Sequence, residues 1–558
     1  MAQLLFKGKQ FVQNHHLTVK YHELIPQKEK SLTDKISLHD NLIIHGDNLK
    51  ALKALLPTYG GKIKCIYIDP PYNTGNEKWA YNDNVNSPMM QEWLGKIVDK
   101  EDLTRHDKWL CMMTPRLKLL RELLSDDGVI FVSIDDNEIN NLRLITDEIF
   151  GDLSFVACVV VQLNPRGRTL DRFFAKTHEY ILVYAKDASI DSSINLLEKV
   201  GDQLQTYSKR DNTGIYRELE LRNRNPVFNR ENRPNLFYPF YVNEVTGEVS
   251  LFKDTNHTIE VFPRNSEGKD GCWTWGKVKA GANTNTLVAR KTSTGNWRVF
   301  RKDYLEDENG NSSTTKTKAL WTEKEINNEK GKEECNEIFG ECPFDFPKSH
   351  HLIKKCITLG ANKNSIILDS FAGSGTTAHA VLTLNKEDGG NRKFILVECE
   401  DYADKITAER VRRVIKGVPT AKNENLKKGL AGTFSYFELG KLIEMESILS
   451  GNNLPTYLEL ARYVFYTATG EEFNEKAVDE KRNFIGENKE YEIYLFYKPD
   501  IEYLKNTALT LDRAKNLGPY KTKKRLVFAP TKYLDQDQLD QYRIDFAQLP
   551  FEIYKLAR

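Results

Sequence analysis

The sequence lacks any apolar run that approaches the length of a membrane span. Residues 1–20 also lack the continuous apolar stretch of a signal peptide, because Lys7, Lys9, His15 and His16 interrupt them. An excess of charge of one sign is missing too, since the formal net charge is +1 over 558 residues. We therefore expect a soluble, cytoplasmic protein, on which any nucleic-acid surface must be a local basic patch.

Cysteine is scarce and scattered, with eight residues and no Cys-x-x-Cys spacing. The nearest pair is Cys335 and Cys342, and no histidine pair accompanies it at the spacing of a zinc site. We predict reduced thiols with structural roles. The carboxylate pairs Asp126–Asp127 and Asp135–Asp136 could suggest a metal, but such pairs at strand and helix boundaries are more often turns and caps. The sequence therefore predicts no metal site.

The chain is longer than a single core usually organises, so several structural units are expected. Strand-like and helix-like stretches alternate in residues 41–189 and again in 346–428, which predicts one doubly wound α/β domain assembled from two segments. Between them, residues 190–345 lose this periodicity and gain Asn, Thr and Gly, as expected of an insert. Residues 1–40 are predicted as an N-terminal arm and 429–558 as a C-terminal α/β domain.

The strongest local pattern is the stretch from Ile66 to Gly75, where a strand ends in Asp69-Pro70-Pro71-Tyr72. Residues 63–68 are mostly branched and apolar, which predicts a buried strand. This strand must stop at the two prolines, because neither can donate a ladder hydrogen bond. A carboxylate, a stiff turn and an aromatic ring are thus fixed at a carboxyl end, where ligands bind in open α/β sheets.

This cluster suits methylation of an exocyclic amine on a base. Such an amine is a poor nucleophile until two acceptors take its hydrogens, and Asp69 and the Pro70 carbonyl can supply them. Tyr72 offers a face on which a flipped base can stack. An ordinary Asp-Pro turn is the alternative, but the full motif is far more specific. We therefore predict Asp69, Pro70, Pro71 and Tyr72 as catalytic residues.

A second strand-and-turn pattern begins with the strand that ends at Asp369. The glycines Gly373 and Gly375 permit close backbone approach to a ligand, and a helix N-terminus follows. The next strand ends in Glu398, which could accept hydrogen bonds from ribose hydroxyls. These features suit S-adenosylmethionine. The pattern Gly373-x-Gly375-x-x-Ala378 also fits a dinucleotide fingerprint, so a nicotinamide-dependent oxidoreductase remains an alternative function. A P-loop is excluded, because no Gly-Lys-Ser/Thr follows.

The insert carries a basic stretch from Gly276 to Lys302, with seven basic residues and no acidic one. Trp297 and Phe300 lie within it, and Trp273 and Trp275 directly precede it. Phosphates bind Lys and Arg, while base edges bind Arg, Asn, Gln and Thr, so this composition favours a DNA-reading surface over a merely solvated face. The DNA-binding candidates are Lys277, Lys279, Arg290, Lys291, Arg298 and Arg301.

The order of these motifs, Asp-Pro-Pro-Tyr before a long insert and then residues 369–377, resembles the β-class of adenine-N6 DNA methyltransferases. The chain is similar in particular to the modification (Mod) subunit of type III restriction-modification systems. Supporting stretches are Lys7–Val19, Gly46–Leu49, His178–Lys186, Arg233–Pro239, Glu337–Gly340 and Phe346–Lys348. The resemblance implies a Rossmann-like, S-adenosylmethionine-dependent methyltransferase domain with a target-recognition insert, acting on N6 of an adenine flipped from duplex DNA.

Applied to this sequence, the family's motifs imply base-amine recognition by Asp69 to Tyr72 and cofactor binding by a second group of residues. Asp47 would lie near the cofactor adenine, although the sequence alone favours a helix-capping role for it. The family often has Pro or Phe where this chain has Ser370. The implied cofactor-binding residues are Asp47, Phe346, Lys348, Asp369, Phe371, Ala372, Gly373, Gly375, Thr376 and Glu398.

The resemblance also implies partners: double-stranded DNA, a second copy of the chain in a homodimer, and a restriction (Res) subunit. In these subunits the C-terminal region resembles an accessory domain used in self-association. Related Pro-Pro-Tyr sites methylate cytosine N4, RNA or a protein glutamine, and these substrates remain alternatives. A non-catalytic DNA-binding module is a further one, although it would have little use for an intact Asp-Pro-Pro-Tyr.

Overall fold

The structure is a computed structural model that describes residues 4–74, 105–167, 172–199, 201–306, 312–442, 454–469, 471, 473–517 and 522–549. Gly75, the last residue of the Asp-Pro-Pro-Tyr stretch, lies outside these ranges. The chain divides into two compact units, one formed by Met1–Asn195 with Lys318–Arg558 and the other by Leu196–Thr317. None of the described helices is long and apolar enough to span a membrane.

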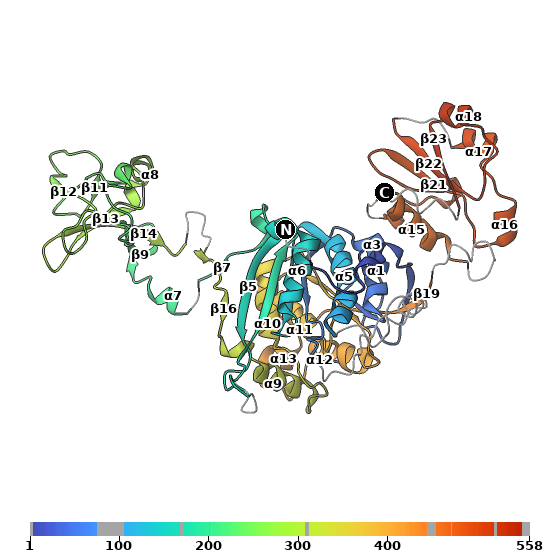
Figure 1. Ribbon diagram of the computed structural model, residues 1–558, viewed down its shortest axis with the longest axis horizontal. Coiled ribbons are helices and arrows are strands. Elements are labelled where there is room, and N and C mark those ends of the chain that lie inside the picture. Colours follow the sequence, from blue (N-terminus) through green and yellow to red (C-terminus); the bar gives the residue numbers. More distant parts are fainter. Residues whose placement is uncertain are drawn as a thin grey trace. The chain divides into compact units, whose positions relative to one another are not determined.

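A ten-stranded sheet forms the centre of the first unit (Figure 1). The neighbouring strands from β19 to β4 run parallel, whereas β1 and β6 are antiparallel to their neighbours. In spatial order the strands are β1 (His22–Pro26), β19 (Ser435–Leu442), β2 (Leu42–His45), β18 (Lys393–Glu398), β17 (Ile366–Asp369), β3 (Ile63–Ile68), β4 (Leu124–Ile134), β6 (His178–Ala185), β5 (Phe155–Gln162) and β16 (Leu320–Trp321).

Two groups of helices cover this sheet. Helices α3 (Asn48–Tyr59), α5 (Arg105–Leu123) and α6 (Ile139–Phe150) pack in sequence, and α10 (His350–Gly360), α11 (Thr376–Asp388) and α12 (Glu409–Lys416) do the same. All six residues of β3 are buried, as expected of a parallel strand covered on both faces. The predicted doubly wound α/β fold is therefore confirmed, and strands from before and after the insert lie in the same sheet.

The predicted elements of this domain match the structure closely because their apolar residues form its core. Leucines of α3 and α5, the isoleucines of β3 and the fully buried Trp109 belong to one cluster, together with Leu368 of β17 and Val397 of β18. The segments before and after the insert thus share a single core. Burial of a leucine or isoleucine side chain contributes roughly 1.5–3 kcal/mol, so this shared core holds the two segments together.

Strand β1 is an edge strand within the predicted N-terminal arm, which its polar composition did not indicate. It pairs with β19, and two short helices precede it, α1 (Lys9–Val12) and α2 (His15–Thr18).

Residues 454–549 include a separate four-stranded sheet in the order β20-β21-β22-β23. Its elements are α15 (Tyr457–Thr469), β20 (Phe484–Glu487), β21 (Tyr491–Leu495), α16 (Ile501–Lys505), α17 (Leu511–Asn516), β22 (Lys524–Ala529), α18 (Gln536–Gln541) and β23 (Ile544–Gln548).

The second unit has a core of its own, which includes Leu221, Phe240, Trp273 and Val299. It contains a four-stranded sheet in the order β13-β14-β9-β8 and a three-stranded sheet in the order β11-β10-β12. Its elements are β7 (Leu197–Glu198), α7 (Asp202–Gln205), β8 (Lys209–Arg210), β9 (Ile215–Glu220), β10 (Phe240–Val242), β11 (Val249–Ser250), β12 (Ile259–Val261), α8 (Lys277–Ala282), β13 (Leu287–Lys291), β14 (Trp297–Tyr304) and β15 (Thr314–Thr315).

One cysteine prediction was wrong. Cys335 in α9 (Asn328–Phe339) and Cys342 just after it form a disulfide, with Cα atoms 5.1 Å apart. Because the helix ends between them, the chain turns back and brings the two side chains together, which their spacing of seven residues alone did not indicate. The other six cysteines are free, as predicted.

Candidate active site

Four predicted site segments meet at the carboxyl edge of the large sheet. Strand β17 lies between β3 and β18, and β18 pairs with β2 on its other side. Because these strands are parallel, the residues at their carboxyl ends share one edge: Asp69 after β3, Asp369 at the end of β17, Glu398 at the end of β18 and Asp47 just after β2. The sheet thus places Asp-Pro-Pro-Tyr beside the glycine turn, although about three hundred residues separate them.

Asp69 places its carboxylate at this edge. Its Oδ1 atom is shielded from solvent and has no partner at ordinary hydrogen-bond distance, although Tyr72 and Lys348 lie close enough to lower the pKa of this carboxyl. Lys348 Nζ, its ion-pair partner, lies 3.6 Å away, which is longer than a hydrogen bond. No described residue donates to the Pro70 carbonyl either. The carboxylate of Asp69, whose side chain is 27% exposed, and the Pro70 carbonyl are thus two acceptors on consecutive residues of this turn.

The turn that carries these acceptors is braced by the residues that follow. Trp109 Nε1 donates to the Pro71 carbonyl at 2.7 Å. Asn73 is fully buried, has a positive φ of 57° and donates from Nδ2 to Glu138 Oε1. Glu138 also accepts from Asn141 Nδ2 at 2.7 Å, so α6 holds the turn. These bonds hold the backbone of the turn that follows Asp69.

Tyr72 belongs to a partly buried polar network with residues from two other chain segments. Its hydroxyl donates to Glu179 Oε2 of β6 at 2.8 Å and accepts from Lys348 Nζ at 2.8 Å. Lys348 Nζ also donates to Glu179 Oε2 at 2.8 Å and lies 4.9 Å from the centre of the Tyr72 ring. The ring is thus held by its hydroxyl, while one lysine links Tyr72, Glu179 and Asp69.

The charges in this network shift one another's ionisation. Burial raises the pKa of Asp69 above its ordinary value, Lys348 opposes this rise and Glu179 adds to it. Burial alone would lower the pKa of Lys348, but Asp69 and Glu179 outweigh it and raise that pKa. The lysine therefore stays protonated and keeps Asp69 an acceptor.

Lys348 was expected among the cofactor-binding residues, and the structure places it against Asp69 and Tyr72. Glu179 was missed as a site residue. Its position in the His178–Lys186 stretch, which supported the family resemblance, was the available signal, but nothing in the sequence indicated that it faces Tyr72. The pairing of β6 with β4, the neighbour of β3, explains this proximity.

The glycine turn after β17 is shaped by two buried carboxylates. Asp369 accepts from Phe371 N at 3.0 Å and from Thr377 Oγ1 at 2.5 Å. Glu398 accepts from Gly373 N at 2.7 Å and from the backbone N–H groups of the two residues that follow it. Burial raises the pKa of both carboxyls to about 7. In this structure both side chains therefore order the turn.

The two predicted glycines of this turn lie where a side chain has no room. Gly375 has a φ of +80°, and a Cβ atom there would lie 2.9 Å from the Thr407 carbonyl oxygen. Gly373 has a φ of +51°, and its Cβ would lie 3.2 Å from the Phe344 ring. Both positive φ angles favour glycine. The predicted role of these glycines was close backbone approach to a ligand, and the contacts described here are instead with other segments of the chain.

The remaining predicted cofactor residues lie around this turn with differing exposure. Phe371 and Ala372 are buried, and Thr376 Oγ1 accepts from Arg410 NH1 at 2.7 Å. Phe346 is 76% exposed. Phe344, which the sequence analysis missed, is the aromatic residue that lies against Gly373.

Asp47 has the capping role that the sequence favoured. Its Oδ1 accepts from Lys50 N at 2.9 Å at the start of α3. Asp47 also lines a cavity of about 390 Å³ beside β2 and β19, together with His45, Lys50 and Glu438. The neighbouring Asn48 donates to the Ser370 carbonyl at 2.9 Å, so the turn after β2 is tied to the turn after β17.

One cluster has the side chains of a metal site. Ligand atoms of Glu334, His350 and His351 lie within 4.8 Å of one another. Glu334 already accepts from Ser349 Oγ at 3.1 Å and from the His350 backbone N at 2.9 Å. These bonds account for the buried carboxylate as a structural link between α9 and α10.

The predicted DNA-binding residues of the second unit fall into two groups. Arg290, Lys291 and Arg298 form ion pairs with carboxylates of other segments, at distances between 2.8 and 3.9 Å. Lys277, Lys279 and Arg301 instead lie over aromatic rings, and no described carboxylate pairs with them. The basic stretch has no acidic residue of its own, but β9 supplies Glu218 and Glu220 from outside it.

Comparison with known proteins agrees with this arrangement. A family model described as DNA methylase matches residues 63–409, more than half of the chain. The Mod subunit of the type III restriction-modification enzyme EcoPI from Escherichia phage P1 is 31% identical over 443 residues, covering 74% of this chain and 68% of the relative. The type II methyltransferase M.KpnI from Klebsiella pneumoniae is 37% identical over 370 residues, covering 66% of this chain and 82% of the relative.

Solved structures give a weaker likeness. The M1.HpyAVI–SAM complex covers 66% of this chain and 99% of its own, with 15% identity and a TM-score of 0.28. The cytosine-N4-specific PvuII DNA methyltransferase covers 66% of this chain and 86% of its own, with 11% identity and a TM-score of 0.31. At these scores neither likeness carries an argument. The family match, together with the EcoPI Mod subunit and M.KpnI, shows that this chain belongs to the DNA methylase family.

Proposed function

We propose that this DNA methylase transfers a methyl group from S-adenosylmethionine to the N6 amine of adenine in duplex DNA, within a restriction-modification system. The observation that carries the proposal is the pair of acceptors on consecutive residues, the partly exposed Asp69 carboxylate and the Pro70 carbonyl, at the carboxyl end of β3. Asp-Pro-Pro-Tyr resembles the adenine form of this motif. The names of the relatives, a type III Mod subunit and a type II methyltransferase, support the biological setting.

The residues of the site would activate the amine by accepting its two hydrogens. Asp69 and the Pro70 carbonyl each take one, so the nitrogen lone pair turns out of the base plane. The Tyr72 ring stacks on the flipped base, and its hydroxyl is kept in place by Glu179 and Lys348. S-adenosylmethionine, when bound, supplies an electrophilic methyl group. The orientation of two reactants within one edge of the sheet supplies much of the rate enhancement.

The charge of the network suits this reaction. Asp69, Glu179 and Lys348 together carry a net charge of −1 when all three are ionised, and Asp69 faces the reacting amine. As the nitrogen becomes positive, the nearby carboxylate stabilises it without moving. A dedicated general base is not required, because the methylated amine becomes acidic and can release its proton late.

The glycine turn fits S-adenosylmethionine. Gly373 and Gly375 leave the backbone bare where a Cβ would collide, and Glu398 lies at the end of the neighbouring strand. Asp369 and Glu398 would hold the turn open for the cofactor, and Asp47 lies one strand further along the same edge. The two halves of the domain would thus bring cofactor and base together across β17 and β3.

The partners form part of the same proposal. Duplex DNA would be the substrate, and a second copy of the chain and a Res subunit would be protein partners. The likeness to relatives named Mod subunits supports this.

Nucleoside analysis tests the proposed activity. The 558-residue chain is incubated with duplex DNA and labelled S-adenosylmethionine, and the digested product is separated into nucleosides. We expect labelled N6-methyladenine. Labelled N4-methylcytosine would instead assign the chain to the other branch of amine methylation, and label retained only by RNA or protein would contradict a DNA substrate.

Replacement of Lys348 by methionine should shift the pH profile of methyl transfer. Without the cation, the pKa of Asp69 rises further, so the carboxyl is protonated and loses its acceptor role at neutral pH. We expect single-turnover transfer at pH 7 to fall about tenfold or more, with partial recovery toward pH 9, since each pKa unit corresponds to about 1.4 kcal/mol.

Lys363→Met is the matched control, because Lys363 is an exposed lysine on the loop before β17. Its profile should match that of the unaltered protein. A Lys348→Met profile that is lower at every pH but unshifted would indicate that the lysine only supports packing.

Cofactor affinity should depend on pH near neutrality. The pKa of Glu398 is about 7, and its ionised form accepts three backbone N–H groups. Protonation weakens these bonds as the pH falls, so we expect the affinity for S-adenosylmethionine to decrease roughly tenfold from pH 8 to pH 6. Calorimetric titration at constant ionic strength measures this. A flat profile would show that the carboxylate form is not needed.

A further inference from the structure

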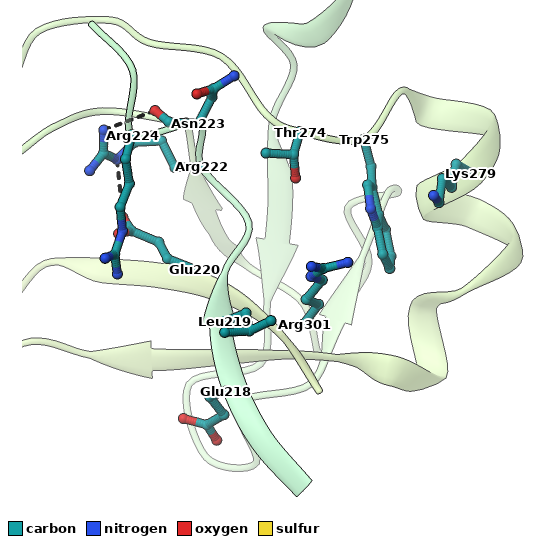
Figure 2. A pocket seen from close by; sticks show the side chains of 10 residues that line it. All are labelled: Glu218, Leu219, Glu220, Arg222, Asn223, Arg224, Thr274, Trp275, Lys279 and Arg301. Carbon is teal, nitrogen blue, oxygen red and sulfur yellow. Dashed lines mark hydrogen bonds and ion pairs between the residues drawn. The ribbon is translucent and has the colours of Figure 1, made fainter. Parts of the chain in front are cut away.

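The second unit contains a cavity of about 500 Å³ whose lining residues all belong to that unit (Figure 2). Three segments surround it: the end of β9 together with the residues that follow β9, the loop before α8, and strand β14. This volume is in the range of sites that hold a small molecule or a single molecular group. Its polar lining includes Glu220, Arg222, Asn223, Arg224, Thr274 and Arg301.

A buried carboxylate orients the arginines of this cavity. The Glu220 side chain is 4% exposed and accepts from Arg222 Nε at 3.0 Å and from Arg224 Nε at 3.3 Å. Arg298 lies 3.9 Å from the same carboxylate. The Arg224 side chain nevertheless remains 77% exposed. Since Glu220 holds Arg224 through Nε, the two terminal nitrogens face solvent, and no described residue accepts a hydrogen bond from them.

Trp275 forms another wall of the cavity, with cations near its ring. Lys279 Nζ of α8 lies 5.1 Å from the ring centre, and the Arg301 guanidinium of β14 lies 6.0 Å from it. Figure 2 shows Trp275 between these two side chains. Neither cation pairs with a described carboxylate. Of the three cations of the basic stretch that pair with no described carboxylate, Lys279 and Arg301 therefore line this cavity, whereas Lys277 does not.

Other cations of the basic stretch are paired with carboxylates. Arg290 donates twice to Glu218, at 3.0 and 2.8 Å, and Lys302 donates to Asp211 at 2.6 Å. These charges are neutralised within the second unit. A phosphate attracted to this unit would gain more at Lys279 and Arg301 than at Arg290 or Lys302.

We propose that the residues of this cavity recognise one base pair of the DNA recognition sequence. This inference rests on the proposed function. Arg224 donates both terminal nitrogens to the O6 and N7 atoms of a guanine, the commonest specific contact of arginine in the major groove. Glu220 fixes the arginine in position, which a non-specific phosphate contact would not need. Lys279 and Arg301 bind the phosphates beside this base pair and position the duplex.

The test is Arg224→Gln in the full-length protein, with Arg264→Gln as the control. Arg264 is also an exposed arginine of this unit held by a carboxylate, Asp270, but it does not line the cavity. Random duplexes bound by each protein are sequenced. We expect Arg224→Gln to lose a guanine preference at one position, on the order of tenfold to hundredfold, and to keep the others. An unchanged set of preferences, or an equal loss at all positions, would overturn the proposal.

Two further variants separate base reading from phosphate contact. Arg224→Lys keeps the charge but loses the planar fork, so it should relax the same position without changing the salt dependence. Lys279→Ala should weaken binding to all sequences alike and reduce the slope of log affinity against log salt by about one. A Lys279→Ala protein with an unchanged slope would remove this face from the DNA surface.

Selection of bound duplexes does not depend on methyl transfer. If the unaltered protein selects a sequence but produces no N6-methyladenine, the proposed function fails while the cavity remains testable. If it methylates adenine and Arg224→Gln keeps every preference, the cavity proposal alone fails. Thermal unfolding of each variant confirms folding, and removal of a side chain that is 77% exposed should change stability little.

Discussion

Replacement of Asp69 by alanine is expected to slow methyl transfer by a factor on the order of 10² to 10³ or more, with little effect on binding. The variant loses a carboxylate whose ion-pair partner, Lys348 Nζ, lies 3.6 Å away, which is longer than a hydrogen bond, and Lys348 keeps its ion pair with Glu179. The acceptor would act as the amine nitrogen becomes tetrahedral, and its loss should therefore be felt mainly in the transition state.

Affinity should survive this change for two reasons. The proposed cofactor site lies on the turns after β17 and β18, and the proposed DNA contacts lie in the second unit. Asp126→Ala is the control, because Asp126 is also a carboxylate at a strand end, but it lies at the amino end of β4 and is 89% exposed. Single-turnover transfer is measured beside separate cofactor and DNA titrations. A folded Asp69→Ala protein with near-normal transfer would remove the catalytic assignment.

Replacement of Gly375 by valine is expected to abolish cofactor binding, and methyl transfer with it. The residue has a φ of +80°, which costs a branched residue roughly 1–2 kcal/mol, and its Cβ would lie 2.9 Å from the Thr407 carbonyl oxygen. Because that obstacle is backbone, it cannot rotate away. The turn must shift, and Gly373 and the start of α11 must shift with it.

Gly389→Val isolates the effect of this collision. Gly389 follows the same helix, has a φ of +66° and would place its Cβ in open space. Both variants bear the strain of a positive φ, but only Gly375→Val meets the Thr407 carbonyl. We expect Gly389→Val to bind S-adenosylmethionine normally in calorimetry, whereas Gly375→Val should show no binding at the same concentration. Equal affinities would contradict a cofactor site at this turn.

The sequence by itself determined the fold class and both central motifs. Strands β3 and β17 are short apolar runs, and the prolines and glycines that end them act through their own backbones. Such signals are local, so they can be recognised without knowing what lies opposite. The capping role of Asp47 was predicted for the same reason, since a cap involves only residues a few positions away.

Only the tertiary structure showed which distant side chains complete the site. Tyr72, Glu179 and Lys348 come from three segments that strand pairing brings together, and residue spacing does not encode such contacts. The same holds for Phe344 against Gly373. In the second unit, the basic stretch contains no acid, yet β9 supplies Glu218 and Glu220 to some of its charges and leaves Lys279 and Arg301 uncompensated. Charge balance depends on neighbours in space, and the sheet decides those neighbours.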